Sequence, residues 1–124
     1  MPEQKIIPIY TSRGDAEAFL VHPYLYNRQG EWIGWVTQER EIYSVLGYYV
    51  GYLTNESRIL RKRNMEISKP RLPPPAKPAR VHPPATIPLA PLMRELYVDT
   101  MDVLLEEPEK LHTIDAGERR EDLD

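Results

Sequence analysis

Apolar and aromatic residues alternate with polar ones in short runs along the first half of the chain, and polar stretches that contain glycine separate the runs. Alternation with a period of two is typical of β-strands. The pattern predicts seven strands of about five residues each. They lie near residues 5–10, 17–21, 24–27, 31–37, 41–45, 48–53 and 58–63. Because successive strands are close in sequence, we expect them to pair as an antiparallel meander.

One passage of the chain is repeated almost in register. Residues 26–36 read aromatic, three residues, Gly, two residues, aliphatic, Gly, aromatic, aliphatic, and residues 43–53 read the same way. A more divergent copy begins at Tyr10, and a half-copy begins at Ile59. A repeat of this kind predicts architecture and names no reaction.

Glycine occupies two kinds of position in the repeat. Gly30 ends a polar loop, where it supplies the positive φ that a short hairpin loop needs. Gly34 and Gly51 fall inside predicted strands, where glycine indicates a bulge or the close approach of another backbone. Ala18 stands at the corresponding place in the first copy, which favours an edge or cap for the first hairpin.

The repeat region carries more aromatic side chains than a small core can absorb. Alternation would place them on both faces of a sheet, and a region of roughly 60 residues has a marginal core. The economical cover for the second face is another copy of the chain packed about a symmetry axis. We therefore expect a homo-oligomer, with a tetramer among the candidates. The residues expected to pack in this assembly are Trp32, Gly34, Trp35, Tyr49, Gly51 and Tyr52.

Changes of composition divide the chain into a β-hairpin repeat domain (4–63), a proline-rich extended linker (64–91) and an acidic C-terminal segment (92–124). The linker holds nine of the thirteen prolines, a density that neither a helix nor a sheet interior accepts. It is expected to form an extended polyproline II arm. Its apolar residues indicate docking on the domain or on a neighbouring copy. They are Ile87 and Leu89, together with Leu92 just after the linker.

The C-terminal segment predicts a short helix near 100–107, with Asp99 or Thr100 as N-cap and Pro108 just past its end. A helix this short is unstable alone and has to dock. The predicted fold is thus all-β, a small antiparallel meander of repeated hairpins that is oligomeric, with an extended proline-rich arm and a short C-terminal helix.

Charge is segregated along the chain. Residues 1–57 carry 4 basic and 7 acidic side chains, residues 58–80 carry 8 and 1, and residues 81–124 carry 4 and 11. Basic residues beside an aromatic sheet suit single-stranded nucleic acid, with charges for phosphate and rings for stacking. The simpler interpretation is a solvated linker and tail. The candidate nucleic-acid contacts are Arg58, Arg61, Lys62 and Arg63.

Pro75, Pro78 and Arg80 match the Pro-x-x-Pro-x-basic ligand of SH3 domains. In a segment this rich in proline such a match is expected by chance. A protein partner for the proline-rich arm or for the acidic helix is the corresponding functional hypothesis.

No catalytic constellation is present in the sequence. The chain has no cysteine, and His22, His82 and His112 lack metal-ligand spacing. No nucleophile elbow or glycine-rich phosphate loop occurs. We therefore expect no enzyme activity, no metal and no cofactor. There is no apolar run of membrane-spanning length and no signal-peptide pattern, which favours a cytoplasmic protein.

The glycine and aromatic positions of 26–36 and 43–53, followed by Arg58, a basic proline-rich stretch and a short acidic segment, resemble the small bacterial proteins called four-fold β flower. The resemblance implies an all-β repeat domain assembled around a four-fold axis, with no assigned function and no known catalytic residues. A looser resemblance, through the Gly-x-x-aliphatic-Gly pattern, is to PRC-barrel modules.

The sequence favours a non-enzymatic, self-assembling scaffold or interaction module. The main alternative is a nucleic-acid-binding module that uses the basic stripe 58–80. A ligand or enzymatic pocket between subunits is a third possibility.

Overall fold

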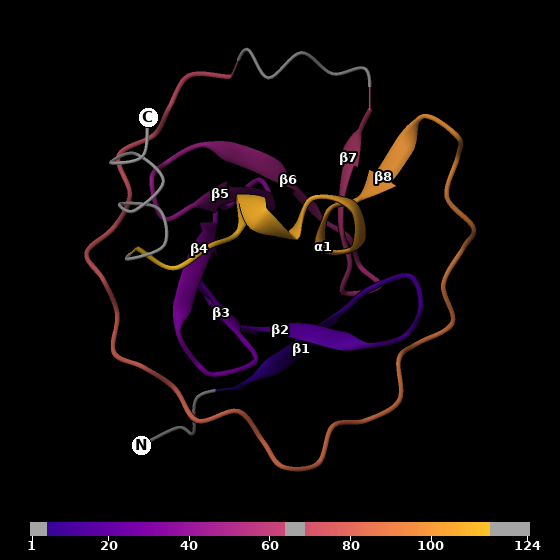
Figure 1. The fold of residues 1–124 in the computed structure, drawn as a ribbon, viewed down its shortest axis with the longest axis horizontal. Coiled ribbons are helices and arrows are strands. Elements are labelled where there is room, and N and C mark those ends of the chain that lie inside the picture. Colours follow the sequence, from indigo (N-terminus) through magenta and orange to yellow (C-terminus); the bar gives the residue numbers. More distant parts are fainter. Residues whose placement is uncertain (1–4, 64–68, 115–124) are drawn as a thin grey trace.

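The computed structural model describes residues 5–63 and 69–114 and consists mostly of one curled, eight-stranded antiparallel sheet (Figure 1). Each strand pairs with the next strand along the chain. The strands are β1 (Ile7–Tyr10), β2 (Ala16–Val21), β3 (Tyr24–Asn27), β4 (Trp32–Val36), β5 (Glu41–Ser44), β6 (Tyr49–Leu53), β7 (Ile59–Lys62) and β8 (Thr100–Asp102). A short helix, α1 (Val103–Glu106), and a 3-10 helix (Pro108–Lys110) follow β8.

The prediction of an all-β meander is confirmed, and all seven predicted strands are present with ends within two residues of those expected. The prediction for the segment near 100–107 is wrong in its first turn. Thr100–Asp102 is strand β8, paired with β7, and the helix begins at Val103 with Asp102 as N-cap. Pairing with the free edge of β7 gives these residues hydrogen bonds and burial that one more turn of an isolated helix would not supply.

The strands form four two-stranded units, namely β1–β2, β3–β4, β5–β6 and β7–β8. In the first three units the register shifts by one residue next to a tyrosine, at Tyr10, Tyr26 and Tyr43. Each copy of the repeat therefore carries a β-bulge at the same place. The fourth unit has no tight turn, because residues 63–99 connect its strands. Strand β8 thus completes the half-copy that begins at Ile59.

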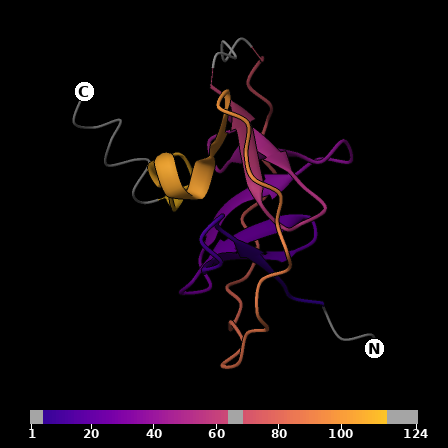
Figure 2. The same ribbon diagram turned by 90° about the vertical axis from the view of Figure 1, so that its right-hand side faces the viewer.

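Alternation along the strands separates an aliphatic face from an aromatic one. The aliphatic face forms the larger core, to which α1 contributes the fully buried Val103 from one side of the sheet (Figure 2). Its other members from the strands are Ile9, Ala18, Leu20, Leu25, Ile33, Val36, Ile42, Val50, Leu53, Ile59 and Met101. The buried rings of the other face are Tyr10, Phe19, Tyr26, Trp32, Tyr43 and Tyr49. The core is thus complete without a second sheet.

Five hairpin turns place a residue with positive φ just before the second strand. Gly14, Gly30 and Gly47 have φ of 91°, 81° and 90°, in the turns within the first three two-stranded units. Arg40 and Ser57 have φ of 65° and 61°, in the turns that join one unit to the next. Because consecutive turns of a meander lie at opposite ends of the sheet, the three glycines share one end and Arg40 and Ser57 share the other. Among these turns, glycine therefore occupies the positive-φ position at one end of the sheet only.

Residues 69–98, here called the strap, contain no helix or strand and run around the outside of the sheet before the chain returns to β8 (Figure 1). As the chain runs along the strap, it contacts the turn of Gly47 first and that of Gly30 next, the reverse of their order in the sequence. The backbone N–H of Leu72 donates to the carbonyl oxygen of Gly47 at 3.0 Å, and that of Val81 donates to Gly30 at 3.1 Å. The two strap residues are nine positions apart, so the strap repeats its contact from one hairpin unit to the next.

These contacts explain why glycine is needed at this end of the sheet. A Cβ atom on Gly47 would lie 2.0 Å from the carbonyl oxygen of Leu72, and one on Gly30 would lie 1.9 Å from that of Val81. No side-chain atom can come so close to a carbonyl oxygen, so only glycine fits at these two positions. At Gly14 the nearest atom is the Cβ of Ala90, at 3.9 Å. The strap therefore packs tightly against the turns of Gly47 and Gly30 and loosely against the turn of Gly14.

Burial along the strap has a period of three. From residue 72 to residue 81 every third side chain is half-buried and the two between are exposed. This is the repeat of a polyproline II chain, which has three residues per turn. One edge of the strap thus contacts the domain. The residues on this edge are Leu72, Pro75, Pro78 and Val81.

Candidate functional site

The four aromatic residues predicted to mediate assembly differ in exposure. Trp32 and Tyr49 are buried, whereas Trp35 and Tyr52 are half-buried. The indole N–H of Trp32 donates to the carbonyl oxygen of Gly34 in its own strand at 2.6 Å. Trp32 and Tyr49 therefore have almost no surface left for another molecule.

The strap covers part of the aromatic face. The Lys69 ammonium lies 4.8 Å from the ring centroid of Tyr49, and the Arg71 guanidinium lies 5.0 Å from that of Tyr48. Burial raises the pKa of Tyr49 above 10.0. The cover that we expect from a second copy is thus supplied at Tyr49 by the same chain, whereas Tyr48 stays 50% exposed. The homo-oligomer stays a prediction, but crowding of aromatic residues no longer argues for it.

Gly34 and Gly51 lie next to backbone, as the sequence indicates. A Cβ atom on Gly34 would be 2.6 Å from the carbonyl oxygen of Tyr43, and one on Gly51 would be 2.5 Å from that of Leu60. Both oxygens belong to the neighbouring strand of the same sheet. These glycines are required within one chain, so their presence carries no argument about assembly.

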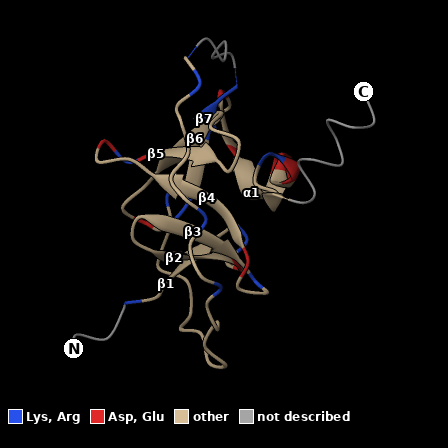
Figure 3. Cartoon of the chain, turned by 90° about the vertical axis from the view of Figure 1, so that its left-hand side faces the viewer, with Lys and Arg blue, Asp and Glu red and all other residues tan. Residues whose placement is uncertain are grey.

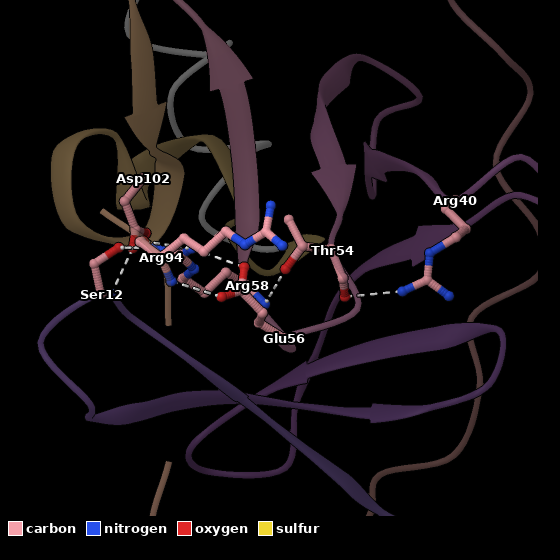
Figure 4. A network of polar contacts seen from close by, with 7 residues as sticks. All are labelled: Ser12, Arg40, Thr54, Glu56, Arg58, Arg94 and Asp102. Atoms are coloured by element: carbon pink, nitrogen blue, oxygen red, sulfur yellow. Dashed lines mark hydrogen bonds and ion pairs between the residues drawn. The ribbon is translucent and has the colours of Figure 1, made fainter. Parts of the chain in front are cut away.

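Arg58, the first candidate nucleic-acid contact, is buried, and its side chain connects the sheet to the strap by hydrogen bonds (Figure 4). Its Nη1 donates to Ser12 Oγ at 2.9 Å, and its Nη2 donates to Glu56 Oε1 at 2.8 Å and to the carbonyl oxygen of Arg94 at 3.0 Å. The second oxygen of Glu56 accepts the N–H of Arg94 at 2.8 Å. Hydrogen bonds from Arg58 and then from Arg94 hold the pKa of Glu56 below its usual 4.5.

Asp102 joins the same network from β8. Its Oδ2 accepts the N–H and the hydroxyl of Ser12 at 2.6 and 2.7 Å. Its Oδ1 and the Nε of Arg58 are buried without a hydrogen-bond partner among the described residues. The network links the first turn, β7, the strap and β8. The pairing of Arg58 with strap and turn atoms was not predicted, since it joins residues up to 46 positions apart in sequence.

Arg61 is also buried, at 5% exposure. It donates to the carbonyl oxygen of Val50 at 3.3 Å and forms an ion pair with Glu107, just after α1. The guanidinium thus fixes the segment after β8 against the middle of the sheet. It cannot contact a phosphate without leaving this position.

Lys62 and Arg63 are the exposed members of the candidate set, and both form ion pairs with acidic side chains. Figure 3 marks basic positions at the end of β7 and acidic positions on α1. Lys62 pairs with Asp99 at 3.3 Å, and Arg63 donates to both carboxylate oxygens of Glu106. These hydrogen bonds lower the pKa values of Asp99 and Glu106. The basic stripe is therefore neutralised in part by the acidic segment, which disfavours the nucleic-acid alternative.

The SH3-type motif is seated on the domain. Pro75 and Pro78 lie on the half-buried edge of the strap, and Arg80 donates to the carbonyl oxygen of Gln29 at 2.9 Å. An SH3 domain could bind both prolines only if this part of the strap detached from the domain. The geometry assigns the three residues to attachment of the strap.

Leu89 and Leu92 do not dock on their own domain, and docking of Ile87, Leu89 and Leu92 on a neighbouring copy stays a prediction. Leu89 and Leu92 are 96% and 100% exposed, and Ile87 is 37% exposed. The side chains that contact the domain are those of the earlier, period-three stretch. The three-residue spacing of a polyproline chain could have identified that stretch, because Leu72 and Val81 are in phase with its prolines.

Comparisons with known proteins identify no relative. No protein-family model, no curated protein and no solved structure matches the chain. The resemblance to the four-fold β flower proteins therefore stays a prediction. In the described residues no helix is long and apolar enough to cross a membrane. Residues 5–63 and 69–114 contain no group of three or more potential metal-ligating side chains.

Proposed function

We propose that the protein is a non-enzymatic interaction module that associates with a second copy of itself through residues 87–98 of the strap. One observation carries this proposal. Of the six large apolar side chains that are exposed among the described residues, five lie in this stretch. They are Ile87, Leu89, Leu92, Tyr97 and Val98.

Three of these side chains are almost completely exposed. Leu89, Leu92 and Val98 are 94% to 100% exposed, so they gain almost nothing from their own chain. Burying such a side chain contributes about 1.5–3 kcal/mol. An extended stretch of this length reaches roughly 35 Å, enough to support an interface that buries about 800 Å² on each partner. Association would remove this apolar surface from water.

Charge favours a second copy as the partner. The only charged residues in 87–98 are Arg94 and Glu95, which cancel. Two such stretches related by a two-fold axis can meet without like-charge repulsion and bring the same apolar side chains together. The whole chain carries a net charge of −3, so contact through more acidic surfaces would be less favourable.

Light scattering of the full-length protein tests the proposal. The wild type should form one oligomeric species, and the double variant Leu89→Ser, Leu92→Ser should be monomeric and still unfold cooperatively, with a thermal midpoint that does not depend on protein concentration. The matched control is Ala76→Ser, Ala85→Ser, at two exposed strap positions outside the stretch, which should leave the oligomer intact. A monomeric wild type at the highest soluble concentration refutes the proposal, as does an oligomer that survives the leucine substitutions.

A further inference from the structure

A pocket of about 460 Å³ opens at the end of the sheet that carries the turns of Arg40 and Ser57. Its volume lies within the range of small-molecule sites, about 300–1,000 Å³. No residue of the strap or of α1 lines it. The site is therefore distinct from the surface proposed for self-association, and it would exist in a monomer.

The pocket has an apolar floor and a polar rim. The floor consists of apolar side chains from four strands, namely Ile7 and Ile9 of β1, Leu20 of β2, Val36 of β4 and Leu53 of β6. The rim comes from the three connecting turns, with His22, Thr37, Gln38, Arg40, Thr54, Asn55 and Ser57. Such a site fits a molecule with an aliphatic part and a polar head.

Arg40 is held in place at the rim (Figure 4). Its Nε donates to the carbonyl oxygen of Leu53 at 3.0 Å, and its Nη2 donates to that of Thr54 at 2.8 Å. The neighbouring turn thus orients the guanidinium before any ligand arrives, which lowers the entropy cost of binding. Arginine presents further N–H groups in the same plane, suited to a carboxylate.

Backbone conformation supports a role for the residues of this rim. Arg40 and Ser57 adopt positive φ, which costs a residue with a side chain about 1–2 kcal/mol. At the other end of the sheet glycine removes this strain. Both strained residues line the pocket. Backbone strain that is retained at a site indicates that the side chains there have a functional role.

The polar groups of the rim favour a negatively charged head. Among the residues that the structure describes, no Asp or Glu lines the pocket, and Arg40 supplies a permanent positive charge. Thr37 Oγ1 and Thr54 Oγ1 each accept a backbone N–H, at 3.2 and 3.1 Å, which leaves their hydroxyl protons to be donated. The adjacent carboxylate of Glu56 is engaged by Arg58 and does not face the ligand space.

From these observations we infer that the pocket binds a small amphiphilic monoanion, of the class of aliphatic carboxylates. The aliphatic tail lies against the apolar floor. The carboxylate accepts hydrogen bonds from Arg40 and from the threonine hydroxyls at the rim.

Isothermal titration of the full-length protein with sodium octanoate tests the inference, with octanol and octylammonium as probes that keep the tail and change the head. Octanoate should bind at least about ten-fold more tightly than either, because a hydrogen-bonded charge pair is worth a factor of that order. Equal binding of the three probes, or no binding of octanoate, overturns the inference.

Two variants locate the site. Arg40→Asn removes the charge and keeps a residue that tolerates positive φ, so the fold should persist while octanoate affinity falls about ten-fold or more. Arg28→Asn makes the same charge change on an exposed turn at the other end of the sheet and should leave affinity unchanged. Equal effects of the two substitutions would place the anion elsewhere. Because octanoate binding is measured on each variant irrespective of oligomeric state, its failure leaves the self-association test standing.

Discussion

Replacing Gly30 with alanine would test whether the turn glycines seat the strap. The new Cβ would lie 1.9 Å from the Val81 carbonyl oxygen, so the strap has to move away from the turn. The hydrogen bond from Val81 N to Gly30 O would be lost, and with it the bond from Arg80 to Gln29 O. The substitution thus acts on the backbone of the turn and on the attachment of the strap.

The expected cost follows from these terms. An alanine with φ near 81° is strained by about 1–2 kcal/mol, and each lost hydrogen bond removes about 0.5–1.5 kcal/mol. We expect Gly30→Ala to destabilise the protein by about 2–5 kcal/mol. Gly14→Ala is the matched control, since its φ is 91° but its nearest neighbour is 3.9 Å away. It should cost only the strain of about 1–2 kcal/mol.

Urea denaturation measures both free energies of unfolding, and limited trypsin digestion reports on the strap itself. The bond after Arg80 is cleaved when the strap opens locally, so its rate follows the population of the open form. Gly30→Ala should raise this rate about ten-fold or more, since about 1.4 kcal/mol of lost attachment is a factor of ten. Equal costs for the two substitutions, with unchanged cleavage after Arg80, would refute the role of the turn glycines.

Two further substitutions distinguish the buried ion pair from an exposed one. Glu56→Gln leaves Arg58 buried without its charged partner and should cost about 1–3 kcal/mol, limited by the 27% exposure of Glu56. Because the folded state lowers the pKa of Glu56, its charge stabilises the wild type above pH 4.5, and this contribution is lost as the pH falls through the lower folded value. Denaturant titrations at pH 7 and at successive pH values below 4.5 should therefore show a steeper loss for the wild type than for the variant; parallel curves would contradict this. Arg63→Gln removes an exposed ion pair with Glu106 and should leave the urea midpoint unchanged at physiological salt, and a large shift would show that the pair is structural.

Local sequence pattern predicted most of the sheet. Each strand from β1 to β6 is followed by a partner after a short turn, so alternation and turn residues are enough to define β1 to β7. The close approach at Gly34 was predictable for the same reason, because the crowding atom belongs to the next strand. Strand β8 was not, since three residues carry no periodic signal and their partner lies about forty positions earlier.

The roles of the charged residues depend on contacts distant in sequence. Arg58 and Arg61 follow a strand pattern at the start of a basic stripe, which indicates solvent exposure when read alone. Their partners Ser12, Arg94 and Glu107 come from three separate parts of the chain. Only the path of the strap brings these groups together, and nothing in the local composition predicts that path. The same holds for the rim around Arg40, which assembles from three turns.

The long connection inside the fourth hairpin unit bears on the order in which the fold assembles. Closing a loop of 37 residues (63–99) costs about 2 kcal/mol more entropy than closing a four-residue turn. The first three units close through such turns and can pair early, since contacts near in sequence form fastest. Strand β8 has to wait until the strap has passed three turns that already exist. We therefore expect the sheet to act as a template on which the strap is laid, with the contact between Arg58 and Arg94 among the last to form.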